Sequence, residues 1–161
     1  MKILLIRNYI IINLAIALIA LVTVYILQYF FGLAPCEMCI KERYPYYLIG
    51  IIAVISICVN FQKSLLLVIA KITYTGLSLI GFLYATYHVG IERKLWIGKS
   101  GCSGNNMTLD IEALSMQLLN APIVRCDEPT ILLNLISIAE LNALVMLGLL
   151  ILNITALYKR I

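Results

Sequence analysis

The sequence predicts an all-α membrane protein, a bundle of four transmembrane helices with a short amphipathic helix in its second outer loop. Two observations carry this prediction. Hydrophobic residues make up 63% of the 161 residues and charged residues only 12%, whereas about a quarter of the residues in a soluble domain are charged. The charged residues are also missing from long continuous segments. So few charges could not cover that much apolar surface in water, and lipid is therefore the expected solvent.

Four segments that contain no Asp, Glu, Lys or Arg define the expected spans. Each reaches or approaches the ~20 residues that a helix needs to cross a hydrocarbon core about 30 Å thick. The first run is longer than the roughly 7–15 apolar residues of a secretory signal peptide, so we expect it to be a retained helix. Within one domain, residues 1–161, spanning helices are expected at about 10–31, 44–61, 72–90 and 139–158.

Lys and Arg predict the orientation of the spans, because cytoplasmic segments carry an excess of basic residues. With four spans, both termini and the loop between the second and third helices lie on one side. That side holds basic residues and no acidic ones: Lys2, Arg7, Lys63, Lys71, Lys159 and Arg160. The loops at about 32–43 and 91–138 hold both kinds and are expected to face outward. Both termini are therefore predicted to be cytoplasmic, and the net charge of +4 does not predict binding to nucleic acid.

The predicted topology places four of the five cysteines on the outer side, where disulfides persist. Cys36 and Cys39 form a C-x-x-C motif in the first outer loop, and Cys102 and Cys126 bracket the second. Two thiols at C-x-x-C spacing can present one thiolate while the other resolves a mixed disulfide. Cys58 lies within the second span and is expected to be an ordinary buried apolar residue.

The neighbours of the C-x-x-C motif predict a reactive thiol near the membrane boundary. Cys39 is expected close to the start of the second helix, where the helix dipole favours a thiolate. Arg43 follows four residues later, a spacing that places two side chains on one helix face, whereas Glu37 opposes the thiolate. His88, the only histidine, lies near the outer end of the third span. If these helix ends pack together, His88 and Arg43 form a polar pocket beside Cys39 that suits a lipid-soluble electron acceptor.

The second outer loop contains apolar residues at helical spacing. These residues are Met107, Ile111, Leu114 and Leu118, with polar residues between them. Such a pattern predicts a short amphipathic helix lying on the membrane surface.

Two other interpretations of the cysteines remain open. Four thiolates could bind zinc in a non-enzymatic membrane scaffold or metal-binding protein, although Cys102 and Cys126 lack the second C-x-x-C of a zinc ribbon. A purely structural disulfide is possible for Cys102–Cys126. It is a weaker explanation for Cys36–Cys39, because so short a closed loop constrains the unfolded chain little.

The segment from Leu33 to Tyr46, LAPCEMCIKERYPY, resembles the P-C-x-x-C-x-x-x-R-Y signature of the bacterial DsbB family. These are membrane oxidases that re-oxidise the periplasmic disulfide donor DsbA. Gln28 and the segments at 87–92, 101–104, 126–128 and 136–142 are also similar to the family, so the resemblance covers nearly the whole chain. Three residues depart from it: Glu37 is unusual between the thiols, and many members have methionine and tryptophan at the positions of Ile138 and Leu141.

The resemblance implies a quinone-dependent protein-disulfide oxidoreductase of the bacterial inner (cytoplasmic) membrane. The disulfides would be Cys36–Cys39 and Cys102–Cys126, and Cys102 would form a transient mixed disulfide with a DsbA-like periplasmic thiol oxidase. Electrons would then pass to the Cys36–Cys39 pair and on to membrane quinone. A vitamin K epoxide reductase-like protein is the alternative within this fold, but such proteins typically carry C-x-x-C late in the bundle.

The same resemblance assigns residues to the acceptor site. Cys39 would engage the quinone, either ubiquinone or menaquinone. Arg43 would promote that step and His88 would help line the quinone site, whereas no metal is expected.

Overall fold

The computed structural model describes residues 2–59, 64–96, 98, 125–127, 131–132 and 136–158. Within these residues the chain forms five helices and one pair of two-residue strands. In chain order they are α1 (Lys2–Tyr29), α2 (Glu37–Lys41), α3 (Tyr44–Cys58), α4 (Ser64–Glu92), β1 (Ile131–Leu132), β2 (Ile136–Ser137) and α6 (Ile138–Tyr158). The predicted amphipathic helix at 107–118 lies outside the described residues.

Three of the described helices are long and apolar enough to cross a membrane. The candidate spans are Leu5–Tyr29, Leu65–Glu92 and Ile138–Tyr158, which makes the chain a helical membrane protein. Helix α3 has 15 residues, fewer than the roughly 17–25 of a typical spanning helix. Helices α1 and α4 also begin eight residues before the expected spans, because a charged residue limits a membrane span but does not end a helix.

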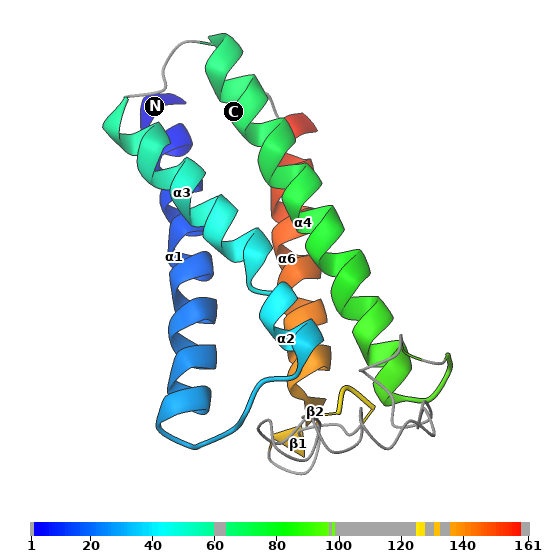
Figure 1. Ribbon diagram of the computed structural model, residues 1–161. Helices are drawn as coiled ribbons and strands as arrows, with labels where there is room; N and C mark the ends of the chain where they lie inside the picture. Colours follow the sequence, from blue (N-terminus) through cyan, green and yellow to red (C-terminus); the bar gives the residue numbers. More distant parts are fainter. Residues whose placement is uncertain are drawn as a thin grey trace, which may run out of the picture.

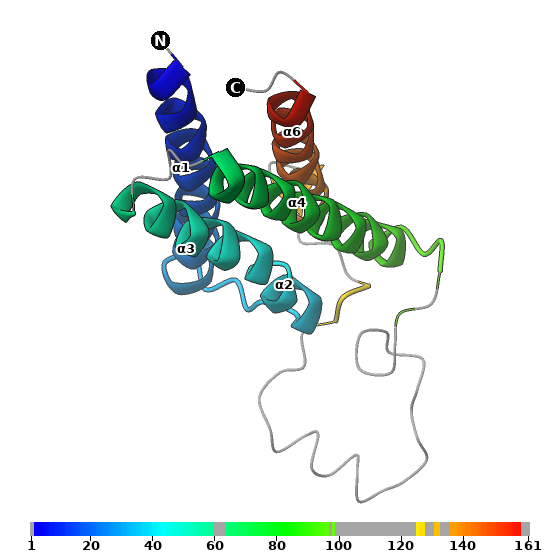
Figure 2. The same ribbon diagram turned by 90° about the horizontal axis from the view of Figure 1, so that it is seen from above.

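The helices are arranged as two pairs, α1 with α3 and α4 with α6, which meet where α3 contacts α4. Figures 1 and 2 show the pairs side by side. The start of α1 and the end of α6 lie together, and we name this the terminal end of the bundle. At the opposite end lie α2, the end of α4 and the start of α6 (Figure 1), and we name it the thiol end.

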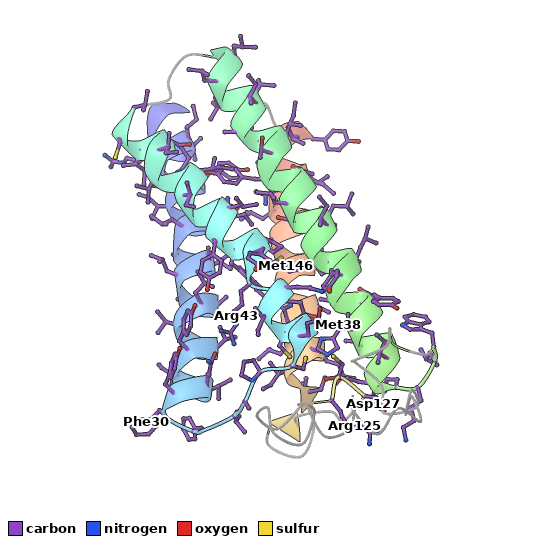
Figure 3. The ribbon with its side chains drawn as sticks, viewed as in Figure 1. Phe30, Met38, Arg43, Arg125, Asp127 and Met146 are labelled. Carbon is purple, nitrogen blue, oxygen red and sulfur yellow. The ribbon has the colours of Figure 1, made fainter. Side chains whose placement is uncertain are left out.

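The core lies where the four long helices meet. Met146, labelled near the middle of the bundle in Figure 3, is fully buried. It packs so closely on Gly81 that a Cβ there would stand 2.7 Å from the Met146 sulfur, so α4 and α6 approach closely. Many apolar side chains face outward instead, among them Leu65 and Ile80 at 70% and 61% exposure. Helices that are apolar on every side are typical of membrane spans.

The loop after α1 turns at Gly32, whose φ of 67° is favourable only for glycine. The Leu33 amide donates to the Leu27 carbonyl at 3.1 Å, which closes the end of α1. After α2, Pro45 occupies the first turn of α3, a position where its fixed φ is already helical.

A capping box starts α6. The Glu140 amide donates to Ser137 Oγ at 3.0 Å, and the Ser137 amide donates to Glu140 Oε2 at 3.1 Å. This reciprocal pair satisfies two amides that the helix leaves open. Immediately before it, β1 and β2 pair antiparallel, with Leu132 opposite Ile136, an element that the sequence did not predict.

The end of α4 is covered by the Trp96 side chain. Its ring stacks on Tyr87 at 5.8 Å between centroids, and its Nε1 donates to the Tyr87 carbonyl at 2.9 Å. A Cβ on Gly90 would stand 1.9 Å from the Trp96 ring. Only glycine therefore allows the indole to lie on this turn of α4.

Candidate functional site

Cys36 and Cys39 lie at the start of the short helix α2. Cys36 is its N-cap, and its sulfur accepts a hydrogen bond from the Cys39 amide at 3.2 Å. The two thiol sulfurs lie 2.7 Å apart. The Cys39 thiol beside it, together with burial, raises the pKa of the Cys36 thiol well above its usual range. The described geometry thus pairs a buried thiol with a more accessible one.

The helix that holds the thiols is not the one that the sequence predicted. Cys39 was expected near the start of the second span, on one continuous helix with Arg43. Instead α2 ends at Lys41 and α3 begins at Tyr44. Glu37, expected to oppose a thiolate, is exposed and forms an ion pair with Lys41, so much of its charge is balanced within α2.

His88 reaches the thiols from α4. Its Nε2 lies 3.6 Å from Cys36 Sγ, and its Nδ1 lies 2.7 Å from Glu42 Oε1. The imidazole is 1% exposed. It was predicted to line an acceptor site, and the structure adds a direct contact with a cysteine sulfur.

A chain of hydrogen bonds continues from Glu42 to α6 and α3. Asn142 Nδ2 donates to Glu42 Oε2 at 2.8 Å, and the Tyr46 hydroxyl donates to Asn142 Oδ1 at 2.6 Å. Sequence reasoning gave no role to Glu42 or Tyr46. The one available signal was a charged pair, Glu42-Arg43, directly before an apolar helix, because an ionisable residue at a span is a functional candidate by default.

Arg43 is held between α1 and α2, as Figure 3 shows. Its Nη1 donates to Gln28 Oε1 at 2.8 Å, and its guanidinium lies 5.1 Å from the centre of the Tyr25 ring. Its Nε is buried and has no hydrogen-bond partner among the described residues. A buried guanidinium nitrogen without an acceptor is costly, so this donor is available to a ligand.

A cavity of about 320 Å³ lies beside these groups. One wall consists of apolar side chains of α1 and α6: Ile16, Ile19, Ala20, Val24, Leu27, Ile138, Ala139, Leu141 and Val145. Polar and sulfur-bearing residues line the rest: Cys36, Cys39, Glu42, Arg43, Tyr46, His88, Glu92, Arg125, Cys126 and Asn142. Ile138 and Leu141, where the sequence departs from the family, therefore both face the cavity. An apolar chamber with a few polar groups at one end is typical of a small-molecule site.

Cys126 is brought to the same place by the segment that precedes α6. It is 1% exposed, and it packs in one cluster with Cys36, Met38 and Ile91. The neighbouring Asp127 accepts two hydrogen bonds from Arg125, at 3.0 and 2.8 Å, and this guanidinium lowers the pKa of the Asp127 carboxyl. Cys102, predicted as the partner of Cys126, lies outside the described residues.

Three of these side chains could also hold a metal ion. The ligating atoms of Cys36, His88 and Cys126 all lie within 4.8 Å of one another. Thiolate and imidazole are the ligands that zinc prefers. The zinc alternative, which the sequence left open, therefore has a defined location.

The chain is similar to known proteins over most of its length. The family described as "Disulfide bond formation protein DsbB" matches residues 6–156. An uncharacterized protein of Rickettsia prowazekii (strain Madrid E) is 31% identical over 139 residues, which cover 84% of this chain and 78% of the relative. No solved structure matches the chain.

Proposed function

The chain belongs to the DsbB family of disulfide bond formation proteins, and on that premise we propose that it re-oxidises a DsbA-type periplasmic thiol oxidase and passes the electrons to membrane quinone. Family membership implies disulfide oxidoreductase activity. The observation that carries the rest is one cavity that combines the Cys36–Cys39 thiols, an apolar wall and the unpartnered Arg43 Nε.

The residues of the cavity fit a quinone. Arg43 Nε is a buried donor without an acceptor in the described residues, and a quinone carbonyl oxygen is an acceptor. Arg43, His88 and Cys39 would hold the head group, and the apolar side chains of α1 and α6 would hold the tail. A bound quinone would take up two electrons and two protons. Gln28 and Tyr25 keep the guanidinium in place by a hydrogen bond and a ring contact.

The proposed electron path runs from the second cysteine pair to the first. A donor dithiol would reduce the Cys102–Cys126 disulfide through a mixed disulfide on Cys102, and the donor would leave oxidised. The Cys126 thiolate would then attack Cys36, forming a Cys36–Cys126 bond and releasing Cys39 as a thiolate. Cys102 would next attack Cys126, which restores the Cys102–Cys126 disulfide, releases Cys36 and leaves the first pair reduced. Supporting this order, Cys126 and Cys36 lie in one buried cluster, and Cys39 is the more accessible thiol of its pair.

We also propose four spans, with α3 as the short one and both termini in the cytoplasm of a bacterial cell. The basic residues around the termini support this orientation. So does the position of the start of α1 and the end of α6 at one end of the bundle (Figure 1). A 15-residue helix is shorter than the membrane core, but neighbouring helices and a locally thinner bilayer accommodate such a mismatch at modest cost.

Quinone reduction driven by a reduced DsbA-type dithiol tests the function. In purified protein, Cys39→Ser is expected to lower the rate at least about a thousandfold, because the thiol that transfers the electrons is gone. Cys58→Ser is the matched control and should react as the parent does. A Cys39→Ser variant that still turns over at the parent rate would show that the proposed path is wrong.

The donor is identified by trapping. In a Cys126→Ser variant, Cys102 should remain joined to its partner, and mass spectrometry of the complex names that partner. If oxidising flux gives no mixed disulfide on Cys102, the assigned order of the two pairs is incorrect.

The metal-binding alternative predicts a different outcome. Stoichiometric zinc in purified protein, together with Cys36 and Cys126 thiols that resist alkylation until a chelator is added, would favour it. The oxidase predicts thiols that alkylate after reduction without a chelator.

A further inference from the structure

Glu42, His88 and Cys36 form a line of contacts from carboxylate to imidazole to sulfur. We propose that His88 is an acid–base catalyst for the Cys36 sulfur, and that Glu42, held by Asn142, positions it. The inference rests on the proposed function and deepens it. It assigns to His88 a reaction with the protein's own thiol in addition to lining the quinone cavity.

Cys36 needs such a partner because of where it lies. It is 5% exposed, and a thiol must lose its proton before it can act as a nucleophile. Burial and the Cys39 thiol both favour the neutral form by raising the pKa of Cys36. Cys36 is also the sulfur that contacts Cys39 on one side and lies near Cys126 on the other. Each exchange between the two cysteine pairs therefore passes through a sulfur that holds its proton tightly.

The geometry suits His88 for moving that proton. With Nδ1 donating to Glu42 Oε1 at 2.7 Å, the other ring nitrogen is left to face Cys36 Sγ at 3.6 Å. Glu42 is 7% exposed, and Asn142 supplies the second hydrogen bond that a buried carboxylate requires. The titratable groups that face the imidazole are Glu42, the Cys36 and Cys126 thiols and, one turn further along α4, Glu92.

The opening of the Cys36–Cys39 disulfide illustrates the step. When a thiolate of an external dithiol such as dithiothreitol attacks Cys39, the more accessible sulfur, a bond forms to Cys39 and the bond between the two cysteines breaks. Its electron pair leaves on Cys36, and the protonated His88 gives its proton to that sulfur. The second thiol of the attacking dithiol then releases Cys39, which leaves both cysteines reduced. In the closing direction His88 takes the proton from Cys36, Cys36 and Cys39 form their bond, and the two electrons and two protons of the pair pass to the quinone of the proposed function.

The first measurement uses neither quinone nor a protein donor. In full-length protein carrying Cys58→Ser, Cys102→Ser and Cys126→Ser, only the Cys36–Cys39 disulfide reacts with dithiothreitol, and its opening is followed by acid quenching and mass spectrometry. We expect His88→Ala to slow opening about 100-fold, as loss of a general acid does. Added imidazole should restore part of the rate, which a purely structural histidine would not permit.

Two further variants separate catalysis from folding. Glu42→Gln keeps an acceptor for His88 but removes the charge, so it should slow opening by a smaller factor than His88→Ala, and Glu42→Asp should recover much of that loss. The matched control is Ser78→Ala, which removes a buried hydrogen bond elsewhere in the bundle and should open at the parent rate.

A second readout is the pH dependence of Cys36 alkylation. It is measured in a variant that adds Cys39→Ser, so that Cys36 is the only thiol. The hydrogen bond from His88 lowers the pKa of Cys36, so His88→Gln should move the alkylation profile to higher pH. An unchanged profile, an unchanged opening rate and no rescue by imidazole would together overturn the proposal. Because these assays omit quinone and donor, a protein that fails to reduce quinone but keeps the His88 effects would refute the proposed function and leave this inference standing.

Discussion

The described residues of the bundle include two clusters of buried polar side chains, and the two differ in kind. The thiol cluster consists of Cys36, Cys39, Glu42, His88 and Cys126. The terminal cluster lies towards the opposite end of the bundle and consists of Tyr9, Asn13, Tyr74, Ser78 and Asn153. There the Tyr9 hydroxyl donates to Asn153 Oδ1 at 2.7 Å, and Asn153 Nδ2 donates to Ser78 Oγ at 3.0 Å. These bonds join α1, α4 and α6 through neutral groups alone.

The comparison shows that an unpartnered polar atom does not identify a ligand site by itself. Among the described residues Asn13 Oδ1, Tyr74 Oη and Arg43 Nε are all buried without a hydrogen-bond partner. Only Arg43 lines the cavity. Neutral hydrogen bonds between helices in lipid contribute to association, whereas the thiol cluster places an acid, a base and three sulfurs beside a chamber. We therefore expect the terminal cluster to govern stability and the thiol cluster to govern reaction.

Of the effects that the comparison of the two clusters predicts, the largest tests the unpartnered Arg43 Nε at the thiol end. Arg43→Leu should raise the KM for quinone about 10–100-fold, because a hydrogen bond to a charged group contributes about 1.5–3 kcal/mol. Gln28→Ala, which removes the hydrogen bond to Nη1 and leaves the charge, should raise it only a few-fold. Steady-state quinone kinetics measure both, and equal KM values in parent and Arg43→Leu would exclude this residue from the acceptor site.

The next effect tests the terminal cluster. Asn153→Ala removes hydrogen bonds to Tyr9 and Ser78 and should lower the free energy of unfolding by about 1–2 kcal/mol, since such bonds in lipid contribute about 0.6 kcal/mol each and a small cavity remains. Unfolding in mixed micelles measures this change. The opening rate of the Cys36–Cys39 disulfide should stay at the parent value, and a large fall in that rate would remove the distinction between the clusters.

The smallest effect concerns the ion pair beside Cys126. Arg125 lowers the pKa of Asp127, so the pair stabilises the folded state above the ordinary pKa of an aspartate and stops doing so as pH falls through the lowered value. Because the Arg125 side chain is 46% exposed and solvent screens the pair, Asp127→Asn should cost less than about 0.5 kcal/mol at pH 7. Thermal unfolding of parent and variant should begin to converge below about pH 4 and coincide once the pH is below the lowered pKa of Asp127. A difference that persists there would mean that the carboxylate charge is not its cause.

The sequence correctly predicted three of the four expected membrane helices and the family, because both depend on local patterns. Long segments without charges correspond to α1, α4 and α6, and the C-x-x-C-x-x-x-R-Y signature indicated the family that matches residues 6–156. The start of α6 was also readable, since the four residues from Ser137 to Glu140 match a capping box.

The contacts between the residues of the site could not be predicted from local sequence patterns. Glu42 contacts His88, which lies 46 residues later in the sequence, and Asn142, which lies 100 residues later. No local sequence pattern encodes contacts over such separations. The break between α2 and α3 was missed for another reason. A motif that begins a helix does not reveal whether that helix continues. The roles of Cys102 and of the amphipathic helix remain predictions.

The contact between Trp96 and Gly90 has a consequence for how deep the chemistry lies in the membrane. Tryptophan prefers the level of the lipid head groups, and the indole here is fastened to α4 at Gly90. His88 lies two residues earlier on the same helix, about 3 Å along its axis. The ring therefore favours a depth at which the imidazole and the neighbouring sulfurs lie near the lipid head groups, at the boundary between water and hydrocarbon. A larger residue at position 90 would displace the indole from α4. The depth of His88 in the membrane would then no longer be fixed by this interfacial tryptophan.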